Sequence, residues 1–123
     1  MAARVLVVDD DPVTVELLQG FLVGKGYEVS TAGDGAEALR MLKEERPHLV
    51  LLDILMPKMD GLEVLRQLRA IDKEVSVIMI TAVNEEETGR QAMALGAFDY
   101  ITKPLDLHYL EQSLWYKITT MTL

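Results

Sequence analysis

The sequence predicts an α/β fold: a doubly wound, five-stranded parallel sheet with five helices that cover both of its faces. Short apolar runs begin at residues 4, 27, 48, 75 and 98, so 21 to 27 residues separate consecutive starts. Each interval has room for one strand, one helix and short loops. The 123 residues, 50% hydrophobic and 26% charged, have the length and composition of one globular domain.

The five runs differ in how continuous their apolar character is. Those at 4–8, 48–52 and 75–80 contain VLVV, LVLL and VIMI, which are typical of strands covered on both faces. The runs at 27–31 and 98–101 include polar residues, as edge strands do. With right-handed crossovers, the simplest strand order is therefore 2-1-3-4-5, which is the flavodoxin-like order.

A helix signal follows each run. Asp11 and Pro12 predict the start of the first helix, and Gly24 or Gly26 predicts its end. The remaining helix starts are predicted at residues whose side chains can cap a helix: Asp34, Asp60, Asn84 and Asp106. Leucines at three- and four-residue spacing supply the faces that pack on the sheet.

The charge and composition exclude several classes of partner. The net charge of −8, with 12 scattered lysines and arginines, argues against direct nucleic-acid binding, because phosphate backbones are bound by clustered basic residues. No apolar run approaches the roughly 18–20 residues of a membrane helix, and no signal-peptide pattern is present. We therefore expect a cytoplasmic domain without membrane contact. Without cysteine, disulfides and thiolate metal sites are excluded.

The predicted strand order brings a set of reactive side chains to one edge of the sheet, where ligands bind in such folds. These residues end or follow strands one, three, four and five: Asp9, Asp10, Asp53, Thr81 and Lys103. Three close carboxylates do not all stay ionised cheaply without a counter-charge, and Mg²⁺ prefers oxygen ligands. We expect Asp9 and Asp10 to bind Mg²⁺ and Asp11 to cap the first helix.

Asp53 ends a strand that is predicted to be buried on both faces. The loop after it, ILMPKMDG, is stiffened by Pro57 and turns at Asp60-Gly61. A carboxylate can attack phosphorus to form an aspartyl phosphate, and phosphoryl transfer depends mainly on positioning and charge neutralisation. Mg²⁺ and the Lys103 ammonium can supply that neutralisation. Asp53 is therefore the candidate nucleophile.

The motifs VVDD, LLDILMPKMDG, ITA and ITKP, each at the end of a predicted strand, resemble the receiver domain of two-component response regulators over roughly residues 4–117. The resemblance implies a phosphorylation-dependent signalling switch whose phosphoacceptor is Asp53. It also implies that Asp9, Asp10, Asp53 and the backbone carbonyl of Leu55 bind Mg²⁺, for which Mn²⁺ is an expected substitute.

Four further residues have roles that the resemblance implies. The Thr81 hydroxyl swings toward the phosphoryl group, and Tyr100 changes rotamer in concert with it. Lys103 binds a phosphoryl oxygen and is followed by a cis peptide bond to Pro104, a geometry that proline makes accessible.

The resemblance also implies partners. The phosphoryl donor is a sensor histidine kinase or a phosphotransfer protein. An effector domain or downstream protein reads the face made by helix four, strand five and helix five, and dimerisation on phosphorylation is left open. Residues after about 117 are expected to begin a linker. Because Leu55 and Val83 flank the site with apolar side chains that do not orient water, we predict a long-lived phosphate.

Two other functions share parts of this pattern. A Mg²⁺-dependent phosphatase with an aspartyl-phosphate intermediate needs an acid where Leu55 stands, and a cap for which no loop is long enough. A flavodoxin-like cofactor binder needs a Ser/Thr/Gly-rich loop after the first strand, where three aspartates would repel a phosphate. The sequence therefore predicts a domain that catalyses only its own phosphorylation and dephosphorylation and is not a dedicated enzyme.

Overall fold

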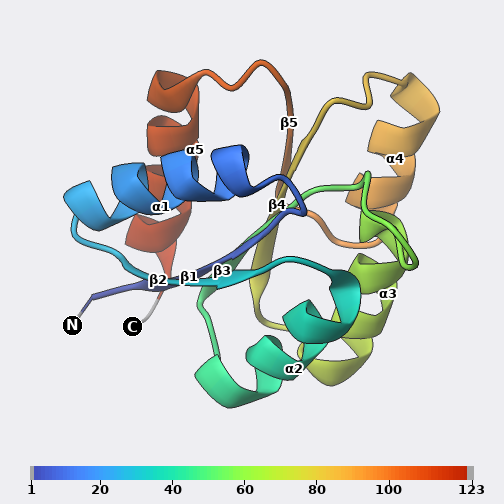
Figure 1. The fold of residues 1–123 in the computed structure, drawn as a ribbon, viewed down its shortest axis with the longest axis horizontal. Coiled ribbons are helices and arrows are strands. Elements are labelled where there is room, and N and C mark those ends of the chain that lie inside the picture. Colours follow the sequence, from blue (N-terminus) through green and yellow to red (C-terminus); the bar gives the residue numbers. More distant parts are fainter. Residues whose placement is uncertain (1, 122–123) are drawn as a thin grey trace.

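Strands and helices alternate along the chain in the computed structural model, which describes residues 2–121 (Figure 1). The strands are β1 (Arg4–Val8), β2 (Glu28–Ala32), β3 (Leu49–Leu52), β4 (Ser76–Thr81) and β5 (Asp99–Thr102). The helices are α1 (Pro12–Gly24), α2 (Gly35–Glu45), α3 (Gly61–Ile71), α4 (Glu86–Ala94) and α5 (Leu107–Thr120). All strand pairs are parallel and the order is β2-β1-β3-β4-β5, so the predicted fold class and strand order are confirmed.

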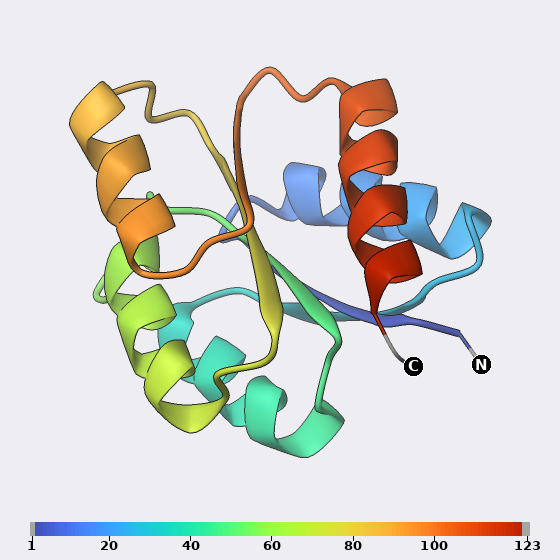
Figure 2. The ribbon, with the colours of Figure 1, turned by 180° about the vertical axis from the view of Figure 1, so that it is seen from behind.

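Two helices cover one face of the sheet and three cover the other. Helices α1 and α5 lie together on one face, and α2, α3 and α4 lie on the opposite one (Figures 1 and 2). Strand side chains alternate between the two cores: Val5 and Val7 pack with α1 and α5, whereas Leu6 and Val8 pack in the other core. Strands β3 and β4 are fully buried, which explains their continuous apolar sequences.

The strand boundaries are displaced slightly from those predicted. The strands predicted to begin at residues 27, 48, 75 and 98 each begin one residue later. At the first of these positions, the Tyr27 N–H donates to the Leu22 carbonyl at 3.1 Å and closes the end of α1 instead of pairing in the sheet. Strand β4 extends to include Thr81, which pairs with Thr102 on β5.

Four predicted helix caps are confirmed, since the carboxylates of Asp11, Asp34, Asp60 and Asp106 accept backbone N–H groups of the following turn. The prediction that Asn84 caps α4 is wrong. Glu85 occupies the capping position, and its side chain accepts no capping hydrogen bond. Glu86 and Glu87 in the first turn instead stabilise the positive end of the helix dipole.

Helix α5 continues to Thr120, past the expected linker start at about residue 117. No helix within residues 2–121 is long and apolar enough to cross a bilayer.

Candidate functional site

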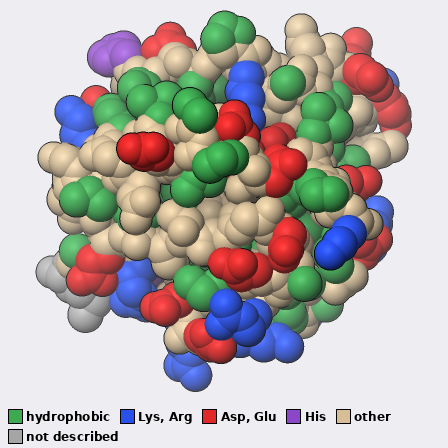
Figure 3. All heavy atoms as spheres, viewed as in Figure 1, with side chains coloured by type: hydrophobic (Ala, Val, Ile, Leu, Met, Phe, Trp, Pro, Cys, Tyr) green, Lys and Arg blue, Asp and Glu red, His purple; other side chains and the backbone are tan. Residues whose placement is uncertain are grey.

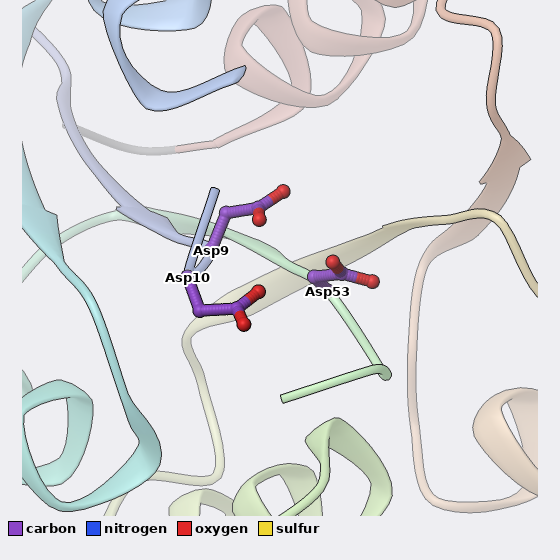
Figure 4. Close-up of side chains that lie close together, drawn as sticks. All are labelled: Asp9, Asp10 and Asp53. Atoms are coloured by element: carbon purple, nitrogen blue, oxygen red, sulfur yellow. The ribbon is translucent and has the colours of Figure 1, made fainter. Parts of the chain in front are cut away.

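The register of β1 and β3 brings two aspartates side by side at the carboxyl edge of the sheet. Val8 on β1 pairs with Leu52 on β3, so the residues that follow, Asp9 and Asp53, leave neighbouring strand ends together (Figure 4). The Asp53 N–H donates to the Val8 carbonyl at 3.0 Å and continues the ladder. With Asp10, these residues bring carboxylate oxygens within 4.8 Å of one another. The predicted cluster is therefore present.

The cluster carries more negative than positive charge. Asp9 and Asp53 are only 3% and 5% exposed, whereas Asp10 is exposed. Lys103 Nζ lies 2.9 Å from Asp9 Oδ2 and 3.3 Å from Asp53 Oδ2, and within residues 2–121 it is the only cation paired with these carboxylates. Three carboxylates and one ammonium sum to a formal charge of −2. A hard divalent cation with oxygen ligands, such as Mg²⁺, fits this donor set.

Acidic side chains also gather near the middle of the molecular face that includes this region, while most basic side chains lie toward its rim (Figure 3).

The pKa values of Asp9 and Lys103 reflect the excess of negative over positive charge at the site. Burial raises the pKa of Asp9, with a further contribution from the charge of Asp53. Burial alone would lower the pKa of Lys103, but its hydrogen bond to Asp9 and the neighbouring carboxylate charges outweigh burial and raise it. The site favours positive charge and disfavours a further negative one.

Thr81 and Tyr100 both bind Val83, which lies in the loop after β4. Thr81 is fully buried, and its hydroxyl accepts a hydrogen bond from the Val83 N–H at 3.3 Å. The Tyr100 hydroxyl donates to the Val83 carbonyl at 2.6 Å. The Lys103 N–H donates to the Thr81 carbonyl at 2.8 Å, and the peptide bond from Lys103 to Pro104 is cis, the geometry that the sequence resemblance implies. These residues therefore form one connected group.

Two backbone N–H groups donate to the buried carboxylates of the site, and no sequence pattern predicts either bond. The Asp11 N–H donates to Asp9 Oδ1 at 2.9 Å, and the Leu55 N–H donates to Asp53 Oδ1 at 3.2 Å. Every residue except proline has such a donor, so side-chain identity does not reveal which ones face a carboxylate. Their effect is to orient both buried carboxylates. The Leu55 side chain itself is 56% exposed.

Comparison with known proteins identifies this arrangement. The family model of the response regulator receiver domain matches residues 5–114. The chain belongs to this family. The receiver domain is a component of two-component response regulators, as the sequence motifs predicted. Receiver domains bind Mg²⁺ at an acidic aspartate cluster, and Asp9, Asp10 and Asp53 form an acidic group in this chain.

Curated relatives share the receiver domain as part of longer proteins. The domain is 46% identical over 104 residues to the alkaline phosphatase synthesis transcriptional regulatory protein PhoP of Bacillus subtilis, covering 85% of this chain and 43% of PhoP. It is 44% identical over 113 residues to the response regulator MprA of Mycobacterium ulcerans, covering 89% of this chain and 47% of MprA. The chain thus spans about half the length of the curated relatives that it matches.

Solved structures share nearly the whole fold. A CheY-like receiver domain protein from Methanospirillum hungatei aligns with a TM-score of 0.93 at 30% identity, covering 97% of this chain and 95% of that one. A chain of the CheX–CheY–BeF3–Mg complex from Borrelia burgdorferi aligns with a TM-score of 0.90 at 36% identity, covering 94% of this chain and 89% of that one.

Proposed function

We propose that this receiver domain is a phosphorylation-dependent switch in which Asp53 accepts a phosphoryl group from a histidine kinase, with Mg²⁺, and changes its partner-binding surface. The observation that carries the proposal is the Lys103 ammonium, which bridges two buried carboxylates from adjacent strand ends. The ammonium places one positive charge where a phosphoryl oxygen would lie. The similar chain from Borrelia burgdorferi belongs to a complex with BeF3 and Mg²⁺, which supports the choice of metal.

Hydrogen bonding favours Asp53 over Asp9 as the nucleophile. Asp9 has both carboxylate oxygens engaged at 2.9 Å, one with the Asp11 N–H and the other with Lys103. The corresponding bonds of Asp53, to the Leu55 N–H and to Lys103, measure 3.2 and 3.3 Å. Because longer bonds hold the lone pairs more weakly, the Asp53 oxygens are the more available for attack on phosphorus. Asp9 then serves as a fixed metal ligand.

The transfer forms one bond and breaks one. An Asp53 oxygen bonds to phosphorus as the bond between phosphorus and the donor imidazole nitrogen breaks, and the released imidazole takes up a proton. Asp9, Asp10, Asp53 and the Leu55 carbonyl would hold Mg²⁺ or Mn²⁺, which when bound would neutralise charge on the phosphoryl oxygens. The Lys103 ammonium, kept protonated by its carboxylate neighbours, would bind another of these oxygens.

The response would pass through Thr81. Its hydroxyl accepts the Val83 N–H in this structure, and binding a phosphoryl oxygen would require the hydroxyl to turn and donate instead. The loop after β4, and Tyr100 with it, would then rearrange. A few new charge-assisted contacts are sufficient when the two states differ by a few kcal/mol.

The changed face would consist of α4, β5 and α5. Its readers would be an effector domain or a downstream protein, and a phosphorylation-induced homodimer is a further form of the same output. Relatives such as PhoP are transcriptional regulators, yet this chain carries a net charge of −8. Any DNA contact would therefore belong to another domain. The domain would catalyse only its own phosphorylation and dephosphorylation, and its output would be binding.

Intact mass spectrometry after incubation with acetyl phosphate and Mg²⁺ tests the proposal. We expect one phosphoryl-sized mass gain in the wild type, and no gain in Asp53→Asn or after chelation of the metal. Asp72→Asn is the matched control, since Asp72 lies between α3 and β4 at the edge of the sheet opposite the cluster, where its carboxylate accepts the Val75 N–H, and its variant should still gain mass. A gain that persists in Asp53→Asn would overturn the assignment of the phosphoacceptor.

A further inference from the structure

The first residue of α3, Gly61, lies against the backbone of the phosphoacceptor. A Cβ atom placed on Gly61 would overlap the carbonyl oxygen of Asp53 and would lie 2.7 Å from the Cα of Ile54. Both obstacles are backbone atoms, so no side chain can rotate away to make room. The φ angle of Gly61 is not positive. A glycine is therefore required here by close approach and not by backbone conformation.

A hydrogen bond fixes this approach. The Gly61 N–H donates to the Ile54 carbonyl at 2.8 Å and closes the loop between β3 and α3 at its base. On the other side, the Asp53 N–H is bound to the Val8 carbonyl of β1 at 3.0 Å. The Asp53–Ile54 segment is thus held between a central strand and the first turn of a helix.

Both sides of this contact are anchored in the core. Val64, Leu65 and Leu68 are at most 2% exposed in the core, and Asp60 caps the helix through the Glu63 N–H at 3.0 Å. In the loop before α3, Ile54 and Met56 are buried in the same core, and Leu55 between them is mostly exposed. An added methyl group at residue 61 would therefore force α3 and the Asp53–Ile54 peptide apart, and either movement changes where the Asp53 carboxylate lies.

We propose that Gly61 is a positioning residue for Asp53: its missing side chain lets α3 pack directly on the Asp53 carbonyl and thereby sets where the carboxylate meets Lys103 and Asp9. This inference rests on the proposed function of Asp53. The bonds from Lys103 Nζ to the two carboxylates, 2.9 and 3.3 Å, leave little room for a shift of the backbone. A displacement of about 1 Å at a reacting group costs about 100-fold in rate.

The test compares Gly61→Ala with Gly35→Ala. Gly35 is also buried, opens α2 and follows a capping aspartate, but the three atoms nearest to a Cβ there belong to the side chains of Val64 and Met59 and not to the Asp53 backbone. For both variants we would measure the melting temperature without metal, its rise on adding Mg²⁺, and the phosphorylation rate with acetyl phosphate. Gly61→Ala should lose the Mg²⁺-dependent rise and phosphorylate about 100-fold more slowly. Gly35→Ala should keep both properties within about twofold of the wild type.

Equal Mg²⁺ responses and equal phosphorylation rates in the two variants would overturn the inference. If the wild type and Gly35→Ala are not phosphorylated, the proposed function fails, and the Mg²⁺ response alone still decides the positioning role. If Gly61→Ala does not fold, amide hydrogen exchange of the wild type replaces it. Mg²⁺ with beryllofluoride should then slow exchange of the Gly61 amide but not of the Val64 amide, which donates to the carbonyl of the capping residue Asp60. Unchanged exchange at Gly61 contradicts the proposal.

Discussion

Thr81 and Tyr100 bind opposite ends of the same residue. The Val83 N–H donates to the Thr81 hydroxyl at 3.3 Å, and the Val83 carbonyl accepts the Tyr100 hydroxyl at 2.6 Å. The two side chains come from adjacent strands, β4 and β5, and the shorter bond is the one to Tyr100. If the Thr81 hydroxyl turns toward a phosphoryl group, the Val83 N–H loses its acceptor. The Tyr100 hydroxyl still binds the Val83 carbonyl, so movement of the loop is coupled to Tyr100.

Removal of the Tyr100 hydroxyl should therefore loosen the loop without removing any group of the phosphoacceptor site. Burial raises the pKa of Tyr100, with help from the charges of Glu85 and Asp53, so the phenol remains a donor at neutral pH. We expect Tyr100→Phe to lower the free energy of unfolding by about 1 kcal/mol, the net value of a typical hydrogen bond. Urea denaturation measures this loss, and phosphorylation by acetyl phosphate should proceed at nearly the wild-type rate.

Tyr109→Phe is the control for this variant, because it removes a tyrosine hydroxyl that binds Asp99 and not Val83. Amide exchange in the loop after β4 should quicken in Tyr100→Phe only. Equal exchange in the two variants would contradict the coupling of Tyr100 to the loop.

Neutralising Asp10 should stabilise the protein without metal and weaken its response to Mg²⁺. Asp10 is exposed, belongs to the carboxylate cluster, and has no ion pair among the described residues. Asp10→Asn removes repulsion from Asp9 and Asp53, so its melting temperature without metal should rise. A ligand at 100 times its Kd adds about 2.7 kcal/mol of stability, and this gain should shrink in the variant. A lower melting temperature without metal would show that the carboxylate has a structural role.

Protonation of His48 should destabilise the fold as the pH falls. The backbone N–H of Arg4 donates to His48 Nδ1 at 2.9 Å, and the backbone N–H of His48 donates to the Arg4 carbonyl at 2.9 Å. Because Nδ1 accepts a hydrogen bond, it carries no proton. Burial, with a further contribution from the charge of Arg4, lowers the pKa of His48 below its ordinary value of 6.5.

The unfolded chain therefore binds this proton more readily than the folded one, and the stability that His48 contributes is complete above pH 6.5 and declines below it. Urea midpoints between pH 7.5 and 5.0 measure the effect. His48→Ala should be less stable at pH 7.5 and should show a shallower decline below pH 6.5 than the wild type. Parallel pH profiles for the two proteins would rule out His48 as the titrating group.

The lifetime of the aspartyl phosphate should depend on Leu55. The backbone N–H of Leu55 binds the Asp53 carboxylate. The Leu55 side chain is 56% exposed and has no group that can orient water. We expect a long-lived phosphate in the wild type. Leu55→Asn should shorten its lifetime roughly tenfold, which is less than the 10²–10⁴ of a fully positioned general base.

The decay of phosphorylated mass after removal of the donor measures this lifetime, with Leu55→Met as the apolar control. Decay of the wild-type phosphate within seconds in Mg²⁺ buffer would contradict the prediction, as would equal lifetimes for the asparagine and methionine variants.

The sequence by itself determined the strand order, four of the five helix caps and the edge at which the aspartates gather. These features depend on local signals: capping bonds span two or three residues, and apolar continuity marks the strands covered on both faces. Because parallel strands end at one edge, knowing that Asp9 and Asp53 follow neighbouring strands was sufficient to bring them together. The local signals failed at α4, where Asn84 looks like a cap and does not act as one.

Only the tertiary structure decided how the site is held. Lys103 lies closer to Asp9, which is 94 residues away along the chain, than to Asp53, which is 50 residues away. The contact of Gly61 with the Asp53 carbonyl depends equally on how α3 packs in the core. Differences of a few tenths of an ångström between distant groups are set by the packing of the whole core, whereas sequence patterns report only neighbours along the chain.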